Sequence, residues 1–139
     1  MISFHFESDY RILDLSEYSD WVARIIESEG FTQGDISYIF YTDEKLLELN
    51  QEYLKHDTFT DIITFDYCDG KVVSGDIFIS TDRVKDNAKT FEVPFEMEMK
   101  RVMSHGLLHL LGYGDKTDEE TVVMRAKEEE KIKMFHVEQ

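Results

Sequence analysis

The chain has very little cysteine and proline: its 139 residues include one of each, Cys68 and Pro94. A single cysteine excludes an internal disulfide, and it argues against a zinc site built from several thiolates. A chain without disulfides suits a reducing compartment, so we expect a cytoplasmic protein. Cys68 itself is expected to be a small side chain of the core or of a hairpin.

Long apolar runs are missing as well. No stretch approaches the ~20 consecutive apolar residues of a membrane-spanning helix, so no membrane partner is expected. Residues 1–6 lack the basic start and the apolar run of a secretory signal. Hydrophobic residues make up 42% of the chain and aromatic residues 13%, which is typical of a folded globular protein. The length fits a single domain that spans residues 1–139.

Positive charge is scarce. The chain carries 15 basic and 30 acidic residues, for a formal net charge of −15. Surfaces that bind nucleic acids are usually basic, so this balance argues against a general nucleic-acid binder. An enzyme that acts on nucleic acid would need a locally basic cleft. The candidates for positive charge near such a cleft are Arg83, Lys85, Lys89, Arg101 and Lys116, although scattered surface charge is the more common role of each.

The hydrophobic periodicity and the turn residues predict a mixed sequence of strands and helices. We expect strands at 2–6, 35–41, 61–67 and 72–80, and helices at 16–29, 43–52, 81–90, from Pro94 through His109, and from the capping box 117–120 to about 135. Gly75 is a candidate for a β-bulge, and Asp69-Gly70 is a strong hairpin turn. The fold class is therefore α+β, with a mixed, roughly four-stranded sheet packed with about five helices.

Two histidines stand four residues apart in the helix that begins near Pro94. This spacing places the imidazoles of His105 and His109 on one helix face, where they can hold one metal ion. Gly112 and Gly114 then break the helix, and Asp115 follows at once with a carboxylate. Two imidazoles and one carboxylate form a three-ligand set of the catalytic type, which leaves a position for water or substrate.

A pair of histidines at this spacing is a weak signal by itself, because buried histidines are often only hydrogen-bonded core residues. Here the neighbouring residues are leucines, so the helix is expected to be buried and its histidines need polar partners. The zinc-peptidase pattern requires a glutamate directly after the first histidine. That position is Gly106, so a peptidase of this type is not expected.

Three stretches resemble the signatures of one family. Residues 105–113 match His-Gly-x-Leu-His-Leu-x-Gly-Tyr of the YbeY family, the bacterial rRNA-maturation metalloendoribonucleases, and residues 49–65 and 74–80 resemble its two other signatures. The family pattern continues with Asp and a third His, where this chain has Gly114 and Asp115. Leu54 stands where the family has an arginine thought to contact substrate phosphate, and Phe59 replaces a proline.

The resemblance implies a single-strand-specific, metal-dependent endoribonuclease that acts in 16S rRNA 3′-end maturation and ribosome quality control. It implies one Zn²⁺ per chain, held by His105, His109 and Asp115, with catalysis through a water bound to the metal. Two histidines and a carboxylate also suit other divalent transition metals. The implied partners are single-stranded RNA and the ribosome or small-subunit proteins.

Four residues are candidates for substrate contacts near this site. Lys55 and His56 are the cations nearest to Leu54 and could replace the missing arginine, although both could equally be solvated loop residues. Thr60 and Asp61 either line the cleft beside the metal or cap the start of a strand, and the structural role is favoured.

Three alternatives remain open from the sequence. The chain could be a non-catalytic, metal-stabilised ribosome assembly factor, which fits the negative charge better. It could be a different metal-dependent hydrolase that acts on peptides or small molecules. Both histidines could also be core residues that bind no metal.

Overall fold

The computed structural model describes residues 1–55 and 60–135. Within them the chain forms four strands and five helices, in the predicted order. The elements are β1 (Ile2–Phe6), α1 (Leu15–Ser28), β2 (Thr32–Tyr41), α2 (Asp43–Leu54), β3 (Ile62–Asp66), β4 (Val72–Ser80), α3 (Thr81–Phe91), α4 (Phe95–Leu110) and α5 (Asp118–Met134).

The strands form one mixed sheet in the order β1-β2-β4-β3. β1, β2 and β4 are parallel, and β3 runs antiparallel to β4. The last two strands form the predicted hairpin, in which Asp69 and Val72 pair beside Gly70, whose φ is +60°. The predicted α+β class and the four-stranded mixed sheet are therefore confirmed.

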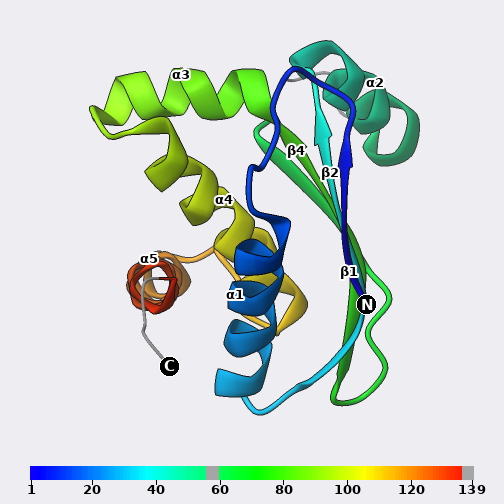
Figure 1. Cartoon of the computed structure of the whole chain (residues 1–139), viewed down its shortest axis with the longest axis vertical. Coiled ribbons are helices and arrows are strands. Elements are labelled where there is room, and N and C mark those ends of the chain that lie inside the picture. The colour runs from blue at the N-terminus through cyan, green and yellow to red at the C-terminus, as the bar shows by residue number, and fades with distance from the viewer. Residues whose placement is uncertain (56–59, 136–139) are drawn as a thin grey trace.

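One face of the sheet carries the core. Alternate residues of the two central strands are fully buried, among them Tyr38, Phe40, Ile77 and Ile79. This period of two is what a strand with one covered face requires. α1, α4 and α5 lie on the same side of the sheet, and α3 extends to that side from the upper end of the sheet (Figure 1).

Helix α4 is the element that the core is built around. Met99, Met103, Leu107 and Leu108 are fully buried on it, and the hydroxyl of Tyr38 donates to the Met103 carbonyl at 3.1 Å. Because α4 is held on both the sheet side and the α5 side, the side chains that it carries have little freedom to move.

Helix α5 docks against α1 and α4. The predicted capping box is present at its start, where Thr117 and Glu120 satisfy each other's backbone N–H groups. Trp21 on α1 donates through Nε1 to the Lys131 carbonyl at 2.7 Å. Lys131 is fully buried, and its ammonium group lies 2.6 Å from Glu29 Oε2. These contacts fix α5 beside α4, and with it the Glu128 side chain.

Several predicted details were wrong, mostly at element ends. α1 begins at residue 15 rather than 16, because Asp14 caps it: its carboxylate accepts from the Glu17 N–H. The sheet irregularity lies in β2 between Gln33 and Ile36, not at Gly75 of β4. β2 begins at residue 32 and α2 ends at residue 54, so both are longer than their apolar patterns indicate.

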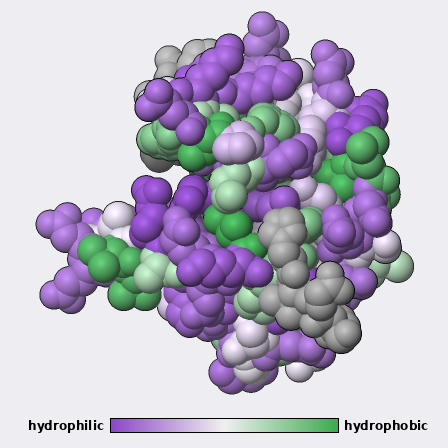
Figure 2. Space-filling view, turned by 60° about the vertical axis from the view of Figure 1, so that its left-hand side comes forward, coloured by the Kyte–Doolittle hydropathy of each residue, from purple (hydrophilic) through white to green (hydrophobic). Residues whose placement is uncertain are grey.

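None of the described helices is long and apolar enough to cross a membrane. In the view of Figure 2, hydrophilic residues cover most of the visible face, and hydrophobic residues gather only in small separate patches. This surface agrees with the high content of charged residues in the chain.

Candidate metal centre

The last turns of α4 and the turn after it bring three donor groups together. His105 and His109 lie on one face of α4, as their spacing predicts, and their Nε2 atoms are 2.9 Å apart. Gly112 has a φ of +102°, a conformation that favours glycine, and it turns the chain back. Asp115 Oδ2 then lies 3.2 Å from His105 Nε2 and 3.3 Å from His109 Nε2.

The turn that carries Asp115 is anchored at two points. The hydroxyl of Tyr113 donates to Glu29 Oε1 at 2.6 Å, which ties the turn to the end of α1. The hydroxyl of Thr121 donates to the Asp115 carbonyl at 3.3 Å, which ties it to α5. The carboxylate is therefore held beside the histidines by contacts from two other helices.

Hydrogen bonds at the other ring nitrogens decide which atoms face the centre. His105 Nδ1 lies 2.6 Å from Glu128 Oε2, and His109 Nδ1 lies 2.9 Å from the Tyr113 carbonyl. Both partners are acceptors, so each Nδ1 carries the proton and donates it. Both Nε2 lone pairs then point at the same place. A carbonyl or carboxylate at the outer nitrogen is the usual support of a metal-binding histidine.

Electrostatics around His105 favour its positive form when no cation is near. Burial acts to lower the pKa of His105, but the hydrogen bond from its ring to Glu128 and the charges of Glu128, Asp115 and Asp61 outweigh burial, so the pKa is raised. The ring thus lies in a negative environment. Such an environment stabilises a divalent cation placed among the same carboxylates.

The donor set fits a divalent transition metal. The three ligand atoms lie within 4.8 Å of one another. Two imidazole nitrogens and one carboxylate oxygen suit Zn²⁺, and the same set suits iron, nickel or manganese. The Nε2 atoms of the two histidines lie 2.9 Å apart and within 3.3 Å of Asp115 Oδ2, so one divalent ion can bind all three groups. His105, His109 and Asp115 therefore form a candidate metal-ligand cluster.

Two hollows meet at this centre. The α3/α5 hollow has a volume of about 360 Å³ and is lined by Asn87, Phe91, Glu98, Arg101, Arg125 and Glu128. The α2/β3 hollow has about 720 Å³ and is lined by Asn50, Leu54, Thr60, Ile63, Thr64 and Lys116. His105, Asp115, Asp61 and Ile62 border both hollows. The candidate metal centre thus lies where the two hollows share lining residues.

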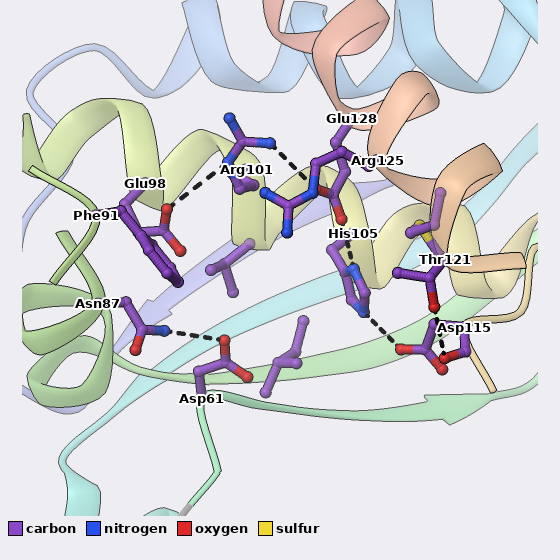
Figure 3. A pocket seen from close by; sticks show the side chains of 13 residues that line it. Asp61, Asn87, Phe91, Glu98, Arg101, His105, Asp115, Thr121, Arg125 and Glu128 are labelled. Atoms are coloured by element: carbon purple, nitrogen blue, oxygen red, sulfur yellow. Dashed lines mark hydrogen bonds and ion pairs between the residues drawn. The ribbon is translucent and has the colours of Figure 1, made fainter. Parts of the chain in front are cut away.

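Figure 3 shows the α3/α5 hollow from close by, with Phe91 and Asn87 on one side and Asp115 on the opposite side. Arg101 connects the acidic residues along its wall. Its guanidinium lies 3.2 Å from Glu128 Oε1, 2.9 Å from Glu129 Oε1 and 3.7 Å from Glu98 Oε1. Arg101 therefore holds Glu128 in the position in which it accepts the hydrogen bond from His105 Nδ1.

The predicted substrate contacts divide into three groups. Thr60 and Asp61 line the hollows, and Asp61 Oδ2 also accepts from the Asn87 amide at 3.3 Å. Lys55 has a left-handed backbone (φ +59°) at the end of α2, and it does not line either hollow. His56 lies outside the described residues. Leu54, at the position of the family's arginine, does line the α2/β3 hollow.

The basic residues that the sequence suggests for the cleft also lie at different positions relative to the two hollows. Lys116 lines the α2/β3 hollow, as Leu54 does, and Arg101 lines the other hollow. Arg83 instead lies 2.7 Å from Asp43 and lines neither hollow. Lys85 and Lys89 line neither hollow.

Sequence reasoning missed several residues at this site. Glu128, Arg125, Asn87 and Phe91 come from α5 and α3, and no local spacing connects them to the histidines. One feature of the sequence does indicate a buried role for Glu128. It shares a helix face with Met124 and Ile132, and an acidic residue on an apolar face requires a partner in the core.

Comparison with known proteins agrees with this fold. A curated protein of Flavobacterium psychrophilum, named endoribonuclease YbeY, is 54% identical over 100% of this chain and 99% of its own length. One of the same name from Flavobacterium johnsoniae is 53% identical over the full length of both chains. The solution structure of a Thermotoga maritima protein covers 97% of this chain and 89% of its own, with 27% identity and a TM-score of 0.70. The family model described as endoribonuclease YbeY matches residues 3–136. The chain belongs to the endoribonuclease YbeY family.

Proposed function

We propose that this protein is a metal-dependent endoribonuclease that cleaves single-stranded RNA, and that it acts in 16S rRNA 3′-end maturation and ribosome quality control. The observation that carries the proposal is the convergence of two Nε2 atoms and one carboxylate oxygen where two hollows meet. The names of the relatives supply the reaction class, because they are called endoribonucleases. One Zn²⁺ per chain is the ion we propose.

The roles of the ligand residues follow from their hydrogen bonds. His105, His109 and Asp115 would hold the ion, and the supporting acceptors keep both histidines in the tautomer that presents Nε2. A bound divalent ion supplies Lewis-acid activation of the phosphodiester and of the attacking water. Of the other described carboxylates, Asp61 borders both hollows. We propose that Asp61 orients the attacking water.

The acidic chain requires local positive charge to bind RNA. Lys116 lines the same hollow as Leu54, so we assign Lys116, rather than Lys55, to the phosphate contact that the family's arginine makes. Arg101 and Arg125 line the other hollow. Arg101 is already paired with glutamates of α4 and α5. Lys116 and Arg125 therefore border the centre from its two sides, where a strand that crosses it would present its phosphates.

A hollow on each side of the centre supports a single-stranded substrate. Unpaired nucleotides can separate and enter such hollows, whereas a stacked duplex is rigid and wide. We propose the cytoplasm as the location and the ribosome or small-subunit proteins as partners, on the basis of the family resemblance.

The test uses two RNAs of one sequence, one single-stranded and one annealed to its complement. Metal-replete protein is expected to cut the single strand, and excess chelator is expected to stop the reaction until Zn²⁺ or another divalent metal is added back. Equal cutting of the duplex would overturn the strand preference. Cutting that persists in chelator would overturn the metal dependence. Ribosome binding without any cutting would favour a non-catalytic assembly factor.

A further inference from the structure

The α3/α5 hollow contains an exposed aromatic ring that the proposed chemistry does not use. Phe91 closes the last turn of α3 and is 55% exposed, although a phenylalanine usually buries its ring. It lines the hollow together with Asn87, which lies one helical turn before it. A half-exposed ring at the wall of a hollow can stack on a flat apolar ligand, and nucleobases are such ligands.

The same hollow contains a buried acceptor that lacks a hydrogen bond. Glu98 is only 3% exposed, and its Oε1 accepts no hydrogen bond from the described residues. Its nearest cation is Arg101, whose Nε lies 3.7 Å from this oxygen, beyond hydrogen-bond distance. Burial raises the pKa of the Glu98 carboxyl. A ligand that donates N–H groups to this oxygen would satisfy it.

The remaining walls suit the rest of a nucleotide. Arg125 extends from α5 into the hollow in Figure 3, and it can meet a phosphate. His105 and Asp115 form the side that faces the metal centre. The hollow's volume of about 360 Å³ is enough for a small ligand, at the lower end of the usual range for binding pockets.

From these contacts we propose that the α3/α5 hollow is a nucleobase subsite, in which Phe91 stacks on the base next to the cleaved phosphodiester and Glu98 reads its edge, with guanine preferred. The inference rests on the proposed ribonuclease function, because it assigns a neighbour of the scissile bond. Guanine presents two adjacent N–H donors, which match a carboxylate. Uracil presents one N–H between two carbonyl oxygens, and these would face the acidic wall unfavourably.

Nucleoside monophosphates test the subsite directly, because they contain no internucleotide bond to cut. GMP, UMP and ribose 5-phosphate are titrated into the full-length protein, with binding followed by NMR chemical shifts. We expect GMP to bind at least about fivefold more tightly than UMP, because a matched pair of hydrogen bonds gives this much discrimination. Equal binding of all three would show that only phosphate is recognised and would overturn the proposal.

Two variants assign the effect to its residues. Phe91→Leu keeps an apolar side chain but loses the ring, and we expect GMP binding to weaken about fivefold or more. Tyr67→Leu removes an aromatic ring of similar exposure (59%) that does not line the hollow, so it should leave GMP binding unchanged. Glu98→Gln should reduce the preference for GMP over UMP. Variants that all bind like the parent protein would overturn the assignment.

Cleavage mapping separates this inference from the function that it rests on. On single-stranded RNA of mixed sequence, cuts should concentrate next to guanines. In Phe91→Leu the cuts should be distributed more evenly among the four bases. If RNA is cut with no base preference and GMP binds no better than UMP, the subsite is wrong while the ribonuclease function stands. If GMP binds selectively through Phe91 but no RNA is cut, the subsite stands and the proposed function fails.

Discussion

Glu128 Oε2 lies 2.6 Å from His105 Nδ1, although 23 residues separate the two along the chain. The contact joins α5 to α4 at the candidate metal centre. Arg101 holds the second carboxylate oxygen at 3.2 Å, so the glutamate cannot turn away. His105 is therefore fixed in ring orientation and in tautomer by a residue that does not itself reach the three donor atoms.

Removing Glu128 should weaken metal binding. Glu128→Ala is expected to lower the affinity for Zn²⁺ about 10- to 100-fold, because the carboxylate that orients a metal-binding histidine typically contributes this much. Glu128→Gln keeps an acceptor for the Nδ1 proton, so it should lie closer to the parent protein. Competition with a chromogenic chelator measures both affinities, and thermal unfolding checks that both variants are folded. Equal affinities in all three proteins would contradict the role of Glu128.

The close packing around Gly106 leaves no room for a glutamate side chain directly after His105. A Cβ atom there would lie 2.6 Å from Ile62 Cδ1 and 2.9 Å from Ile77 Cγ2, so the position faces the sheet and not the hollows. Gly106→Ala should gain helix propensity but overpack the core, for a net loss of about 1 kcal/mol in unfolding free energy. Urea unfolding measures the change. A more stable variant would mean that α4 has room to move away from the sheet.

The Glu29 carboxylate accepts hydrogen bonds from Tyr113, Lys127 and Lys131. These bonds predict an acid-sensitive contact between α1 and α5. Partial burial acts to raise the pKa of Glu29, but hydrogen bonds from Lys131, Tyr113 and Lys127 outweigh it and lower the pKa from 4.5 to about 2. The carboxylate form is thus favoured by folding. Its stabilising contribution, about 3 kcal/mol at most, is complete above pH 4.5 and is lost as the pH falls towards 2.

Comparing two variants isolates that contribution. Glu29→Gln should be less stable than the parent protein at pH 7, and the difference should shrink between pH 4.5 and pH 2. Glu27→Gln alters an exposed residue of the same helix and should follow the parent protein throughout. Urea unfolding at a series of pH values gives the curves. A difference that stays constant with pH would show that the ion pairs of Glu29 are not its source.

Lys116 should contribute to RNA binding through charge alone. Lys116→Gln is expected to weaken the binding of single-stranded RNA at low salt and to reduce the slope of log K against log salt by about 0.7, since one phosphate contact is lost. Lys85→Gln removes a lysine that lines neither hollow, so it should change the slope little. Fluorescence anisotropy between 50 and 200 mM salt, a range over which phosphate contacts change affinity strongly, measures both. Identical slopes for the two variants would show that Lys116 does not contact an RNA phosphate.

Local patterns predicted the parts of the site that are close in sequence. The spacing of His105 and His109, the glycine turn and Asp115 lie within eleven residues, so helix geometry and turn chemistry were enough to bring them together. The Asp69-Gly70 hairpin and the box at Thr117 followed from equally local rules. Helix ends were less certain, because caps such as Asp14 compete with neighbouring serines for the same role.

The support of the site depends on long-range packing, which the sequence alone did not show. Glu128 reaches His105 only because α5 docks on α1 through Trp21 and Lys131. Phe91 and Asn87 reach the hollow because α3 packs against α4. Lys55 is close to Leu54 in sequence, whereas Lys116 lines the same hollow as Leu54.

Metal content and RNA cleavage, measured on the same preparations of three proteins, test the central claim most directly. The parent protein should contain about one divalent metal ion per chain and cut single-stranded RNA. His109→Ala should lose both properties while it keeps its fold by circular dichroism, and His5→Ala, which alters an exposed histidine of β1, should keep both. His109→Ala protein that retains full cleavage, or parent protein that cuts RNA without metal, would contradict the account.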